Sequence, residues 1–281
     1  MTLRATQRSR MIEKAQPIGV FDSGLGGLTV LKEILSELPL ESTVYLGDTA
    51  RVPYGIRSPE TVTRYSFENT RFLSSRGIKM LVVACNTVSA VSLDAIKRSL
   101  AIPVIGVIEP GAKAAVNATK SKKVGVIGTS ATIRSRSYTR AIQAADPSVE
   151  VFALPCPLFV PLVEEGWTDG PIVELTAERY LRAVREKGVD TLVLGCTHYP
   201  LLKSVLSAVM GKGVRLIDSA IETAGEIKKT LGGMSLLNTS AGGVSQEFYV
   251  TDSPDKFIEV GERFLGRKID FIKKIELGPE V

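Results

Sequence analysis

The chain has 281 residues, of which 44% are hydrophobic and 23% charged, and its formal net charge is +5. That length allows one large or two ordinary domains with a substantial core, and the composition is typical of a soluble protein. No apolar run approaches the roughly 18–20 residues of a membrane span, so the sequence predicts no membrane partner. The basic residues are scattered and only 6% of residues are aromatic, which argues against a nucleic-acid partner.

The first sixteen residues contain three arginines and one lysine but no apolar segment like that of a secretory signal. We expect residues 1–16 to form a disordered basic tail, in which Met11 is an alternative start. Because no export signal is recognisable, we expect a cytoplasmic protein with free thiols.

Short apolar runs alternate along the chain with segments that have helical spacing of apolar residues, which is typical of an α/β fold. In the first part, strands are expected at residues 18–21, 43–46, 80–84 and 102–107, and helices at 28–38, 60–75 and 88–96. A glycine-rich turn, Gly24-Leu25-Gly26-Gly27, follows the first strand but lacks the G-x-G-x-x-G spacing of a dinucleotide site. Asp22 would also repel a phosphate, so a small ligand contacted by Asp22 and Ser23 fits better.

An irregular loop, residues 47–55, follows the second expected strand and contains Pro53 and two glycines. It is either a simple connector or, because it follows the carboxyl end of a strand, part of a substrate site. The residues alone leave both interpretations open.

The pattern then repeats, because Val124-Gly125-Val126-Ile127-Gly128-Thr129 parallels Ile18-Gly19-Val20-Phe21-Asp22-Ser23, 106 residues earlier. Further elements are expected in chain order as strands at 124–129, 149–153, 191–194, 214–217 and 248–251, and as helices at 129–145, 172–186, after Pro200, at 219–231 and near the C-terminus. The repeat predicts two related α/β domains. We expect a first domain at 17–107 plus 217–281 and a second at 108–216.

Two of the three cysteines stand at equivalent strand-to-helix corners, 111 residues apart. Cys85 and Cys196 each follow an expected buried strand, and Cys196 lies next to the only histidine, His198. Open α/β sheets bind ligands at such corners. The third cysteine, Cys156, is best interpreted as a buried core residue.

Three interpretations of the paired cysteines compete. They are core residues, or they form a zinc site that would need all three cysteines and His198, although no C-x-x-C pair exists. In the third interpretation Cys85 and Cys196 face each other across a cleft, because inverting a carbon that carries an acidic hydrogen needs a base on one face and an acid on the other. A helix N-terminus after each cysteine would lower the pKa of its thiol. Asp22 and His198 would then assist the two thiols.

Five segments together resemble the motif set of the glutamate racemase family, within the aspartate/glutamate racemases, and they occur in the same order: residues 21–28 (FDSGLGGL), 53–55 (PYG), 84–87 (ACNT), 128–129 (GT) with Thr132, and 195–200 (GCTHYP). The resemblance extends from about Pro17 to the C-terminal region. It implies an α/β fold of two pseudo-symmetric parallel-sheet domains with the active site in the cleft between them. It also implies a homodimeric enzyme without cofactor or metal that interconverts L- and D-glutamate for peptidoglycan synthesis.

By the same resemblance, Cys85 and Cys196 correspond to the two catalytic thiols. Cys196 would deprotonate L-glutamate while Cys85 protonates the opposite face, and the roles reverse for D-glutamate. Asp22 would assist Cys85, and His198 would assist Cys196.

Glu164 corresponds to the auxiliary carboxylate behind the histidine, with the adjacent Glu165 as an alternative. The implied substrate contacts are Asp22, Ser23, Tyr54, Gly55, Asn86, Thr87, Thr129, Thr132, Thr197 and His198. Two other functions stay open at this point: an aspartate racemase of the same family, and a two-domain amino-acid-binding protein without catalysis.

Overall fold

The computed structural model describes residues 13–240 and 242–278. Most of the expected basic tail, including Met11, lies outside the described residues. Residues 13–15, which were expected within that tail, are helical. The carbonyl of Lys14 accepts a hydrogen bond from Lys79 Nζ at 2.6 Å, so this end of the segment is attached to the start of a central strand.

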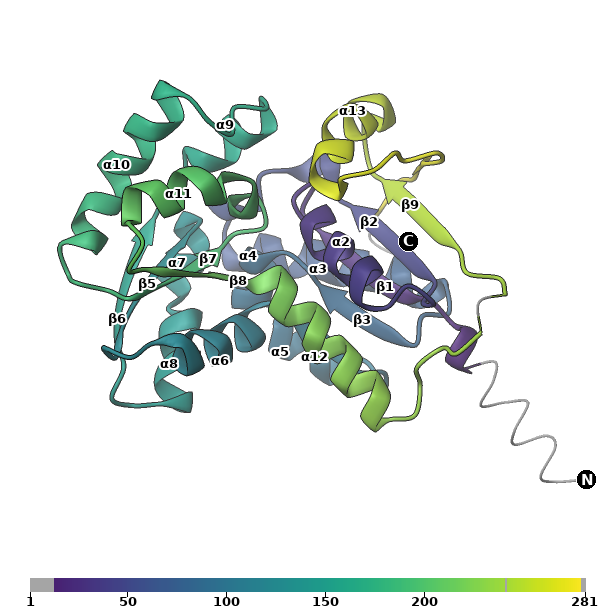
Figure 1. Ribbon diagram of the computed structural model, residues 1–281. Coiled ribbons are helices and arrows are strands. Elements are labelled where there is room, and N and C mark those ends of the chain that lie inside the picture. Colours follow the sequence, from purple (N-terminus) through teal and green to yellow (C-terminus); the bar gives the residue numbers. More distant parts are fainter. Residues whose placement is uncertain (1–12, 241, 279–281) are drawn as a thin grey trace, which may run out of the picture.

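Two separate parallel β-sheets form the framework of the molecule (Figure 1). The first sheet contains β1 (Ile18–Asp22), β2 (Thr43–Gly47), β3 (Met80–Val83), β4 (Val104–Gly106), β9 (Gln246–Val250) and β10 (Lys273–Lys274). Its order is β10-β9-β2-β1-β3-β4. The late strand β9 pairs with β2, so the last part of the chain returns to the first sheet.

The second sheet contains β5 (Lys123–Gly128), β6 (Glu150–Pro155), β7 (Thr191–Gly195) and β8 (Arg215–Asp218). Its order, β6-β5-β7-β8, repeats the order β2-β1-β3-β4 of the first sheet. Every strand pair in both sheets is parallel. The predicted fold class, two related parallel-sheet α/β domains, is therefore confirmed.

Helices cover the sheets, as parallel sheets require because both faces must be buried. In the described residues they are α2 (Leu28–Glu37), α3 (Pro59–Ser75), α4 (Asn86–Val91), α5 (Leu93–Ser99), α6 (Ile108–Ala118), α7 (Ser130–Ser135), α8 (Ser137–Ala145), α9 (Phe159–Glu164), α10 (Pro171–Arg185), α11 (Lys203–Met210), α12 (Ser219–Gly233) and α13 (Pro254–Leu265). Within the part of the chain that the structure describes, three short 3₁₀ turns also lie in the loops: η1 (Thr49–Arg51), η2 (Tyr54–Ile56) and η3 (Tyr199–Leu202). None of the described helices is both long and apolar enough to cross a membrane.

Local sequence explains where several helices begin. At the start of α3, the Ser58 side chain accepts a hydrogen bond from the backbone of Thr61, and Pro59 occupies the first turn. At the start of α7, Thr129 accepts in the same way from the backbone of Thr132. Two expected helices are each divided in two, at Ser92 and at Arg136.

Each sheet with the helices that pack on it is called a unit below, the first unit being built on the sheet of β1 and the second on the sheet of β5. The helix α12 connects the two units. It follows β8 of the second sheet directly and packs against α2 of the first unit and α6 of the second (Figure 1). The next helix, α13, also packs against α2. The central strands β1, β3 and β7 are buried along their whole length, so the residues that follow their carboxyl ends have fixed positions.

Candidate active site

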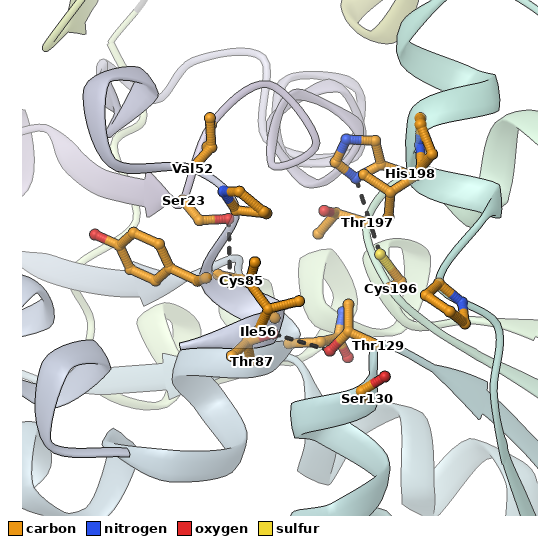
Figure 2. Close-up of a pocket in the computed structure, with 18 of the residues that line it drawn as sticks. Ser23, Val52, Ile56, Cys85, Thr87, Thr129, Ser130, Cys196, Thr197 and His198 are labelled. Carbon is orange, nitrogen blue, oxygen red and sulfur yellow. Dashed lines mark hydrogen bonds between the residues drawn. The ribbon is translucent and has the colours of Figure 1, made fainter. Parts of the chain in front are cut away.

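A cavity of about 310 Å³ lies where the carboxyl ends of four strands from both sheets converge. Ser23 follows β1, Cys85 follows β3, Thr129 follows β5 and Cys196 follows β7, and all four line the cavity. Figure 2 shows Cys85 and Cys196 on different sides of this cavity, supported by different strands. The equivalent ends of the two repeated sheets therefore form one site, as expected for ligand sites of α/β proteins.

Most of the residues predicted from the sequence meet at this cavity. Those that line it are Ser23, Tyr54, Gly55, Cys85, Asn86, Thr87, Thr129, Glu164, Cys196, Thr197 and His198. Asp22 and Thr132 do not line it. Both are 1% exposed and lie behind the wall, where the Thr132 hydroxyl is 3.0 Å from the Thr129 hydroxyl.

The first thiol, Cys85, precedes the first turn of α4 and is 5% exposed. Its Sγ donates a hydrogen bond to Ser23 Oγ at 3.5 Å (Figure 2). Burial and the charge of Asp22 raise the pKa of Cys85 to about 12, although its hydrogen bonds with Ser23 and with the backbone of Val88 oppose this shift. The expectation that the helix N-terminus lowers the pKa of this thiol is therefore wrong, because desolvation outweighs it.

Asp22 is the charged group behind Cys85. Its Oδ2 accepts a hydrogen bond from the Gly24 backbone at 2.9 Å, and its Oδ1 has no partner among the described residues. Burial raises the pKa of Asp22, although the charge of His198 and backbone N–H groups oppose this shift. Asp22 therefore does not line the cavity, and its charge affects the two neighbouring groups Cys85 and His198.

The second thiol belongs to a chain of three polar groups. Cys196 Sγ lies 3.8 Å from His198 Nδ1, and His198 Nε2 lies 3.0 Å from Glu164 Oε1. Burial alone would lower the pKa of His198, but its contacts with Cys196 and Glu164 outweigh burial and raise that pKa to about 10. The protonated imidazole therefore places a positive charge directly beside Cys196. Glu165 is exposed and does not line the cavity, so the carboxylate that contacts the histidine is Glu164.

The corner at Cys196 also differs from the expected geometry. The residues after it form a turn and then the 3₁₀ segment η3, and α11 begins only at Lys203. An α-helix N-terminus therefore follows Cys85 directly but not Cys196. The electrostatic support of Cys196 comes from His198 instead.

The glycine-rich turn after β1 packs against the Cys196 corner. A Cβ added to Gly26 would lie 2.1 Å from Thr197 Oγ1 and 2.6 Å from His198 Nδ1. No side chain fits in that space, which gives a physical reason for glycine here. The turn thus brings the first unit into direct contact with the histidine of the second.

Hydroxyl groups form another part of the cavity wall. Thr87 Oγ1 lies 3.1 Å from Thr129 Oγ1 (Figure 2), which joins α4 of the first unit to the start of α7 in the second. A Cβ on Gly55 would lie 3.0 Å from Thr129 Cβ, so the irregular loop at residues 47–55 also packs here. The hydroxyl of Tyr54 points elsewhere, since it donates to Asp48 and accepts from Asn69 Nδ2 at 3.2 Å.

Sequence reasoning missed the apolar part of the wall. The unexpected lining residues are Gly24, Val52, Pro53, Ile56, Ser130, Pro157, Val160 and Pro161. Val52 and Pro53 belong to the irregular loop at residues 47–55, which the sequence left open as part of a substrate site. Pro157 lies just before α9, and Val160 and Pro161 lie within it, so their position at the cavity depends on how α9 packs.

Cys156 is fully buried in the core and does not line the cavity, which confirms its interpretation as a core residue. In residues 13–240 and 242–278, no three His, Cys, Asp or Glu side chains are arranged to hold a metal ion. The zinc-site interpretation therefore has no support in the geometry. The site instead contains two thiols, one histidine–carboxylate pair and several hydroxyls. Such groups can donate and accept protons, so the site is suited to acid–base chemistry on a small polar molecule.

The comparisons with known proteins agree with this class of site. Residues 18–227 match the Asp/Glu/Hydantoin racemase family, and the chain belongs to that family. A glutamate racemase from Geobacter metallireducens is 57% identical over 263 residues, which make up 94% of this chain and 97% of that protein.

Solved structures agree in fold over almost the whole chain. A glutamate racemase from Francisella tularensis, crystallised in complex with D-glutamate, has a TM-score of 0.88 at 41% identity, covering 94% of this chain and 98% of its own. The glutamate racemase isoform RacE1 from Bacillus anthracis has a TM-score of 0.91 at 43% identity with the same coverage.

Proposed function

We propose that this chain is a glutamate racemase that interconverts L- and D-glutamate by proton transfer between Cys85 and Cys196. The observation that carries the proposal is the presence of two thiols, from equivalent corners of two repeated units, on different sides of one cavity (Figure 2). The similarity to proteins named glutamate racemase, one of them crystallised with D-glutamate, supports the choice of substrate.

The two thiols have different surroundings, and the difference suits one direction of the reaction. The raised pKa of Cys85 keeps its proton in place, while protonated His198 lies beside Cys196 and is held there by Glu164. In this state Cys196 removes the α-proton of L-glutamate, and Cys85 delivers its own proton to the opposite face of the α-carbon. The products are D-glutamate, a Cys196 thiol and a Cys85 thiolate, which the reverse reaction or proton exchange with solvent returns to the starting state.

Neutral donors would hold the two carboxylates of the substrate. The wall offers the hydroxyls of Ser23, Thr87, Thr129 and Thr197 and the amide of Asn86. Such groups orient a substrate without binding its ground state so strongly that the barrier rises. The volume of about 310 Å³ is at the low end for ligand sites, which suits a small amino acid.

The proton transfers need no cofactor or metal, because the thiols and their neighbours supply both acid and base. We place the enzyme in the cytoplasm, where D-glutamate would serve peptidoglycan synthesis and so cell-wall biogenesis and cell shape. We further propose a homodimer. Light scattering at assay concentration tests this assembly, and a purely monomeric protein would contradict it.

The test of the function is a chiral assay of the purified protein with L-glutamate and, in parallel, L-aspartate. We expect the circular-dichroism signal of L-glutamate to decay to zero, and the decay to be lost in Cys85→Ala and in Cys196→Ala. Faster turnover of aspartate would identify the protein as an aspartate racemase. A stable signal with both amino acids, together with tight binding of glutamate, would identify a non-catalytic binding protein.

A further inference from the structure

One buried tyrosine contacts the residues next to both cysteines, Asn86 beside Cys85 and Gly195 beside Cys196. Tyr138 is the second residue of α8 and is 2% exposed. Its hydroxyl donates a hydrogen bond to Asn86 Oδ1 at 2.8 Å, although Tyr138 belongs to the second unit and Asn86 to the first. Asn86 directly follows Cys85, so the hydrogen bond reaches the first corner.

The ring of the same tyrosine lies against the second corner. A Cβ added to Gly195 would lie 3.0 Å from Tyr138 Cε2, which is tighter than most contacts of a real Cβ. Gly195 ends β7 and directly precedes Cys196. Tyr138 therefore packs against the corner of Cys196 and donates a hydrogen bond to the corner of Cys85.

The hydrogen bond from Tyr138 occupies the oxygen end of the Asn86 amide. Asn86 is 2% exposed and lines the cavity, and its Nδ2 has no hydrogen-bond partner among the described residues. Burial raises the pKa of Tyr138, so the hydroxyl keeps the proton that it donates. With Oδ1 occupied by this donor, the two N–H bonds of Nδ2 remain for a bound acceptor.

The backbone before Tyr138 is specially arranged to place it there. Arg136 has the left-handed values φ 57° and ψ 17°, a conformation that is unfavourable for a non-glycine residue. It divides the expected single helix into α7, which carries Thr132 behind the wall, and α8. The Ser137 hydroxyl then donates to the carbonyl of Ala90 at the end of α4, at 3.0 Å, which fastens α8 to the helix of Asn86.

We propose that Tyr138 is a positioning residue that orients the Asn86 amide, so that its N–H groups bind a carboxylate of the substrate. This inference rests on the proposed function and extends it to a residue that does not touch the cavity. Tyr138 acts through Asn86 and therefore affects binding of the substrate more than the proton transfers.

The test compares Tyr138→Phe with Tyr249→Phe. Tyr249 is a matched control, because it is also buried and its hydroxyl donates one hydrogen bond, to Glu247 Oε2 at 2.6 Å, far from the cavity lining. In Tyr138→Phe we expect the Kd for D-glutamate by calorimetry and the KM to rise roughly tenfold, as loss of an orienting hydrogen bond implies, with little change in kcat. Tyr249→Phe should leave Kd, KM and kcat unchanged.

A double variant shows whether the effect passes through Asn86. In an Asn86→Ala background, Tyr138→Phe should weaken D-glutamate binding no further, because the amide to be oriented is absent. Equal weakening in both backgrounds would overturn the inference, as would a Tyr138→Phe variant that matches Tyr249→Phe. An inactive wild-type protein would refute the proposed racemase function, whereas an active wild type with an unaffected Tyr138→Phe refutes only this inference.

A second variant covers the case in which Tyr138→Phe unfolds. Asn86→Asp keeps an oxygen for the Tyr138 hydroxyl but puts the other oxygen of a negatively charged carboxylate in the place of Nδ2. We expect this variant to lose D-glutamate binding, because the oxygen repels a carboxylate where Nδ2 attracted one. Retained binding would show that a hydrogen-bond donor at this position is not required, and the inference would be wrong.

Discussion

Replacing Gly26 by alanine tests how closely the glycine-rich turn supports the Cys196 corner. The new Cβ would lie 2.1 Å from Thr197 Oγ1 and 2.6 Å from His198 Nδ1. To reach ordinary contact at 3.4 Å, the Thr197 hydroxyl would have to move by about 1.3 Å and the imidazole nitrogen by about 0.8 Å. The Thr197 carbonyl accepts a hydrogen bond from the Thr29 hydroxyl at 3.0 Å, and the imidazole packs edge-to-face against Phe264, with ring centroids 5.2 Å apart.

The cost follows from this lack of room. Overpacking a closely packed site costs about 1–3 kcal/mol. A displacement of about 1 Å at a catalytic group can reduce the rate about 100-fold. Because Gly26 contacts the histidine that supports Cys196, we expect kcat of Gly26→Ala to fall roughly 100-fold, with a loss of unfolding free energy of about 1–3 kcal/mol.

The assay is the chiral assay with L-glutamate, combined with chemical denaturation. Gly225→Ala in α12 is the matched control, because a Cβ there meets nothing within 4 Å. It should keep full activity and gain about 0.5–1 kcal/mol of stability, as glycine in a helix is unfavourable relative to alanine. A Gly26→Ala protein with wild-type kcat and stability would refute the reasoning.

The remaining predictions concern the groups around the second thiol. Glu164→Gln should reduce kcat at least tenfold by weakening the charge on His198, whereas Glu165→Gln should have little effect in the same assay. The pKa of His198 is raised from 6.5 to about 10, so the stability that its charge contributes should be complete below pH 6.5 and disappear as the pH rises toward 10. Chemical denaturation of wild type and His198→Asn at both pH values measures this contribution, and a difference in unfolding free energy that does not change with pH would contradict it. Cys156→Ala should keep most activity but lose stability on removal of a buried side chain, as thermal melting would show. Activity should survive exhaustive chelation, and loss that zinc restores would refute metal independence.

The strand framework could be predicted because each strand of the two repeats is a short apolar run that ends at polar or glycine residues. The helix α6 was not expected, since Pro110 and Gly111 near its start look like loop residues, although proline fits the first turn of a helix. The short strand β10 consists of two exposed lysines and has no apolar signal. The helix break at Arg136 depends on tertiary contacts that local sequence does not encode.

The site was predictable where it depends on topology. Residues after parallel strands share one edge of a sheet, so Ser23, Cys85 and Cys196 could be assigned from their positions alone. The pKa of Cys85 could not, because it depends on burial beside Asp22. Neither could the proposed role of Tyr138, which is the second residue of α8 and reaches Asn86 only through tertiary hydrogen bonds between α8 and α4.

In the proposed mechanism, two fixed thiols exchange protons with opposite faces of the α-carbon of glutamate. A single base that serves both faces exchanges its proton with solvent and can return deuterium to the face from which it took hydrogen. Two bases separate these events, since Cys196 would remove the hydrogen of L-glutamate while Cys85 supplies a solvent-derived one.

The most direct measurement is turnover of L-glutamate in heavy water, followed by chiral separation and mass spectrometry at low conversion. We expect the D-glutamate formed to carry deuterium at the α-carbon, while the recovered L-glutamate still carries its original hydrogen. With D-glutamate as the substrate, the pattern should reverse. Recovered L-glutamate that gains deuterium as fast as the product forms would contradict proton transfer by two separate thiols.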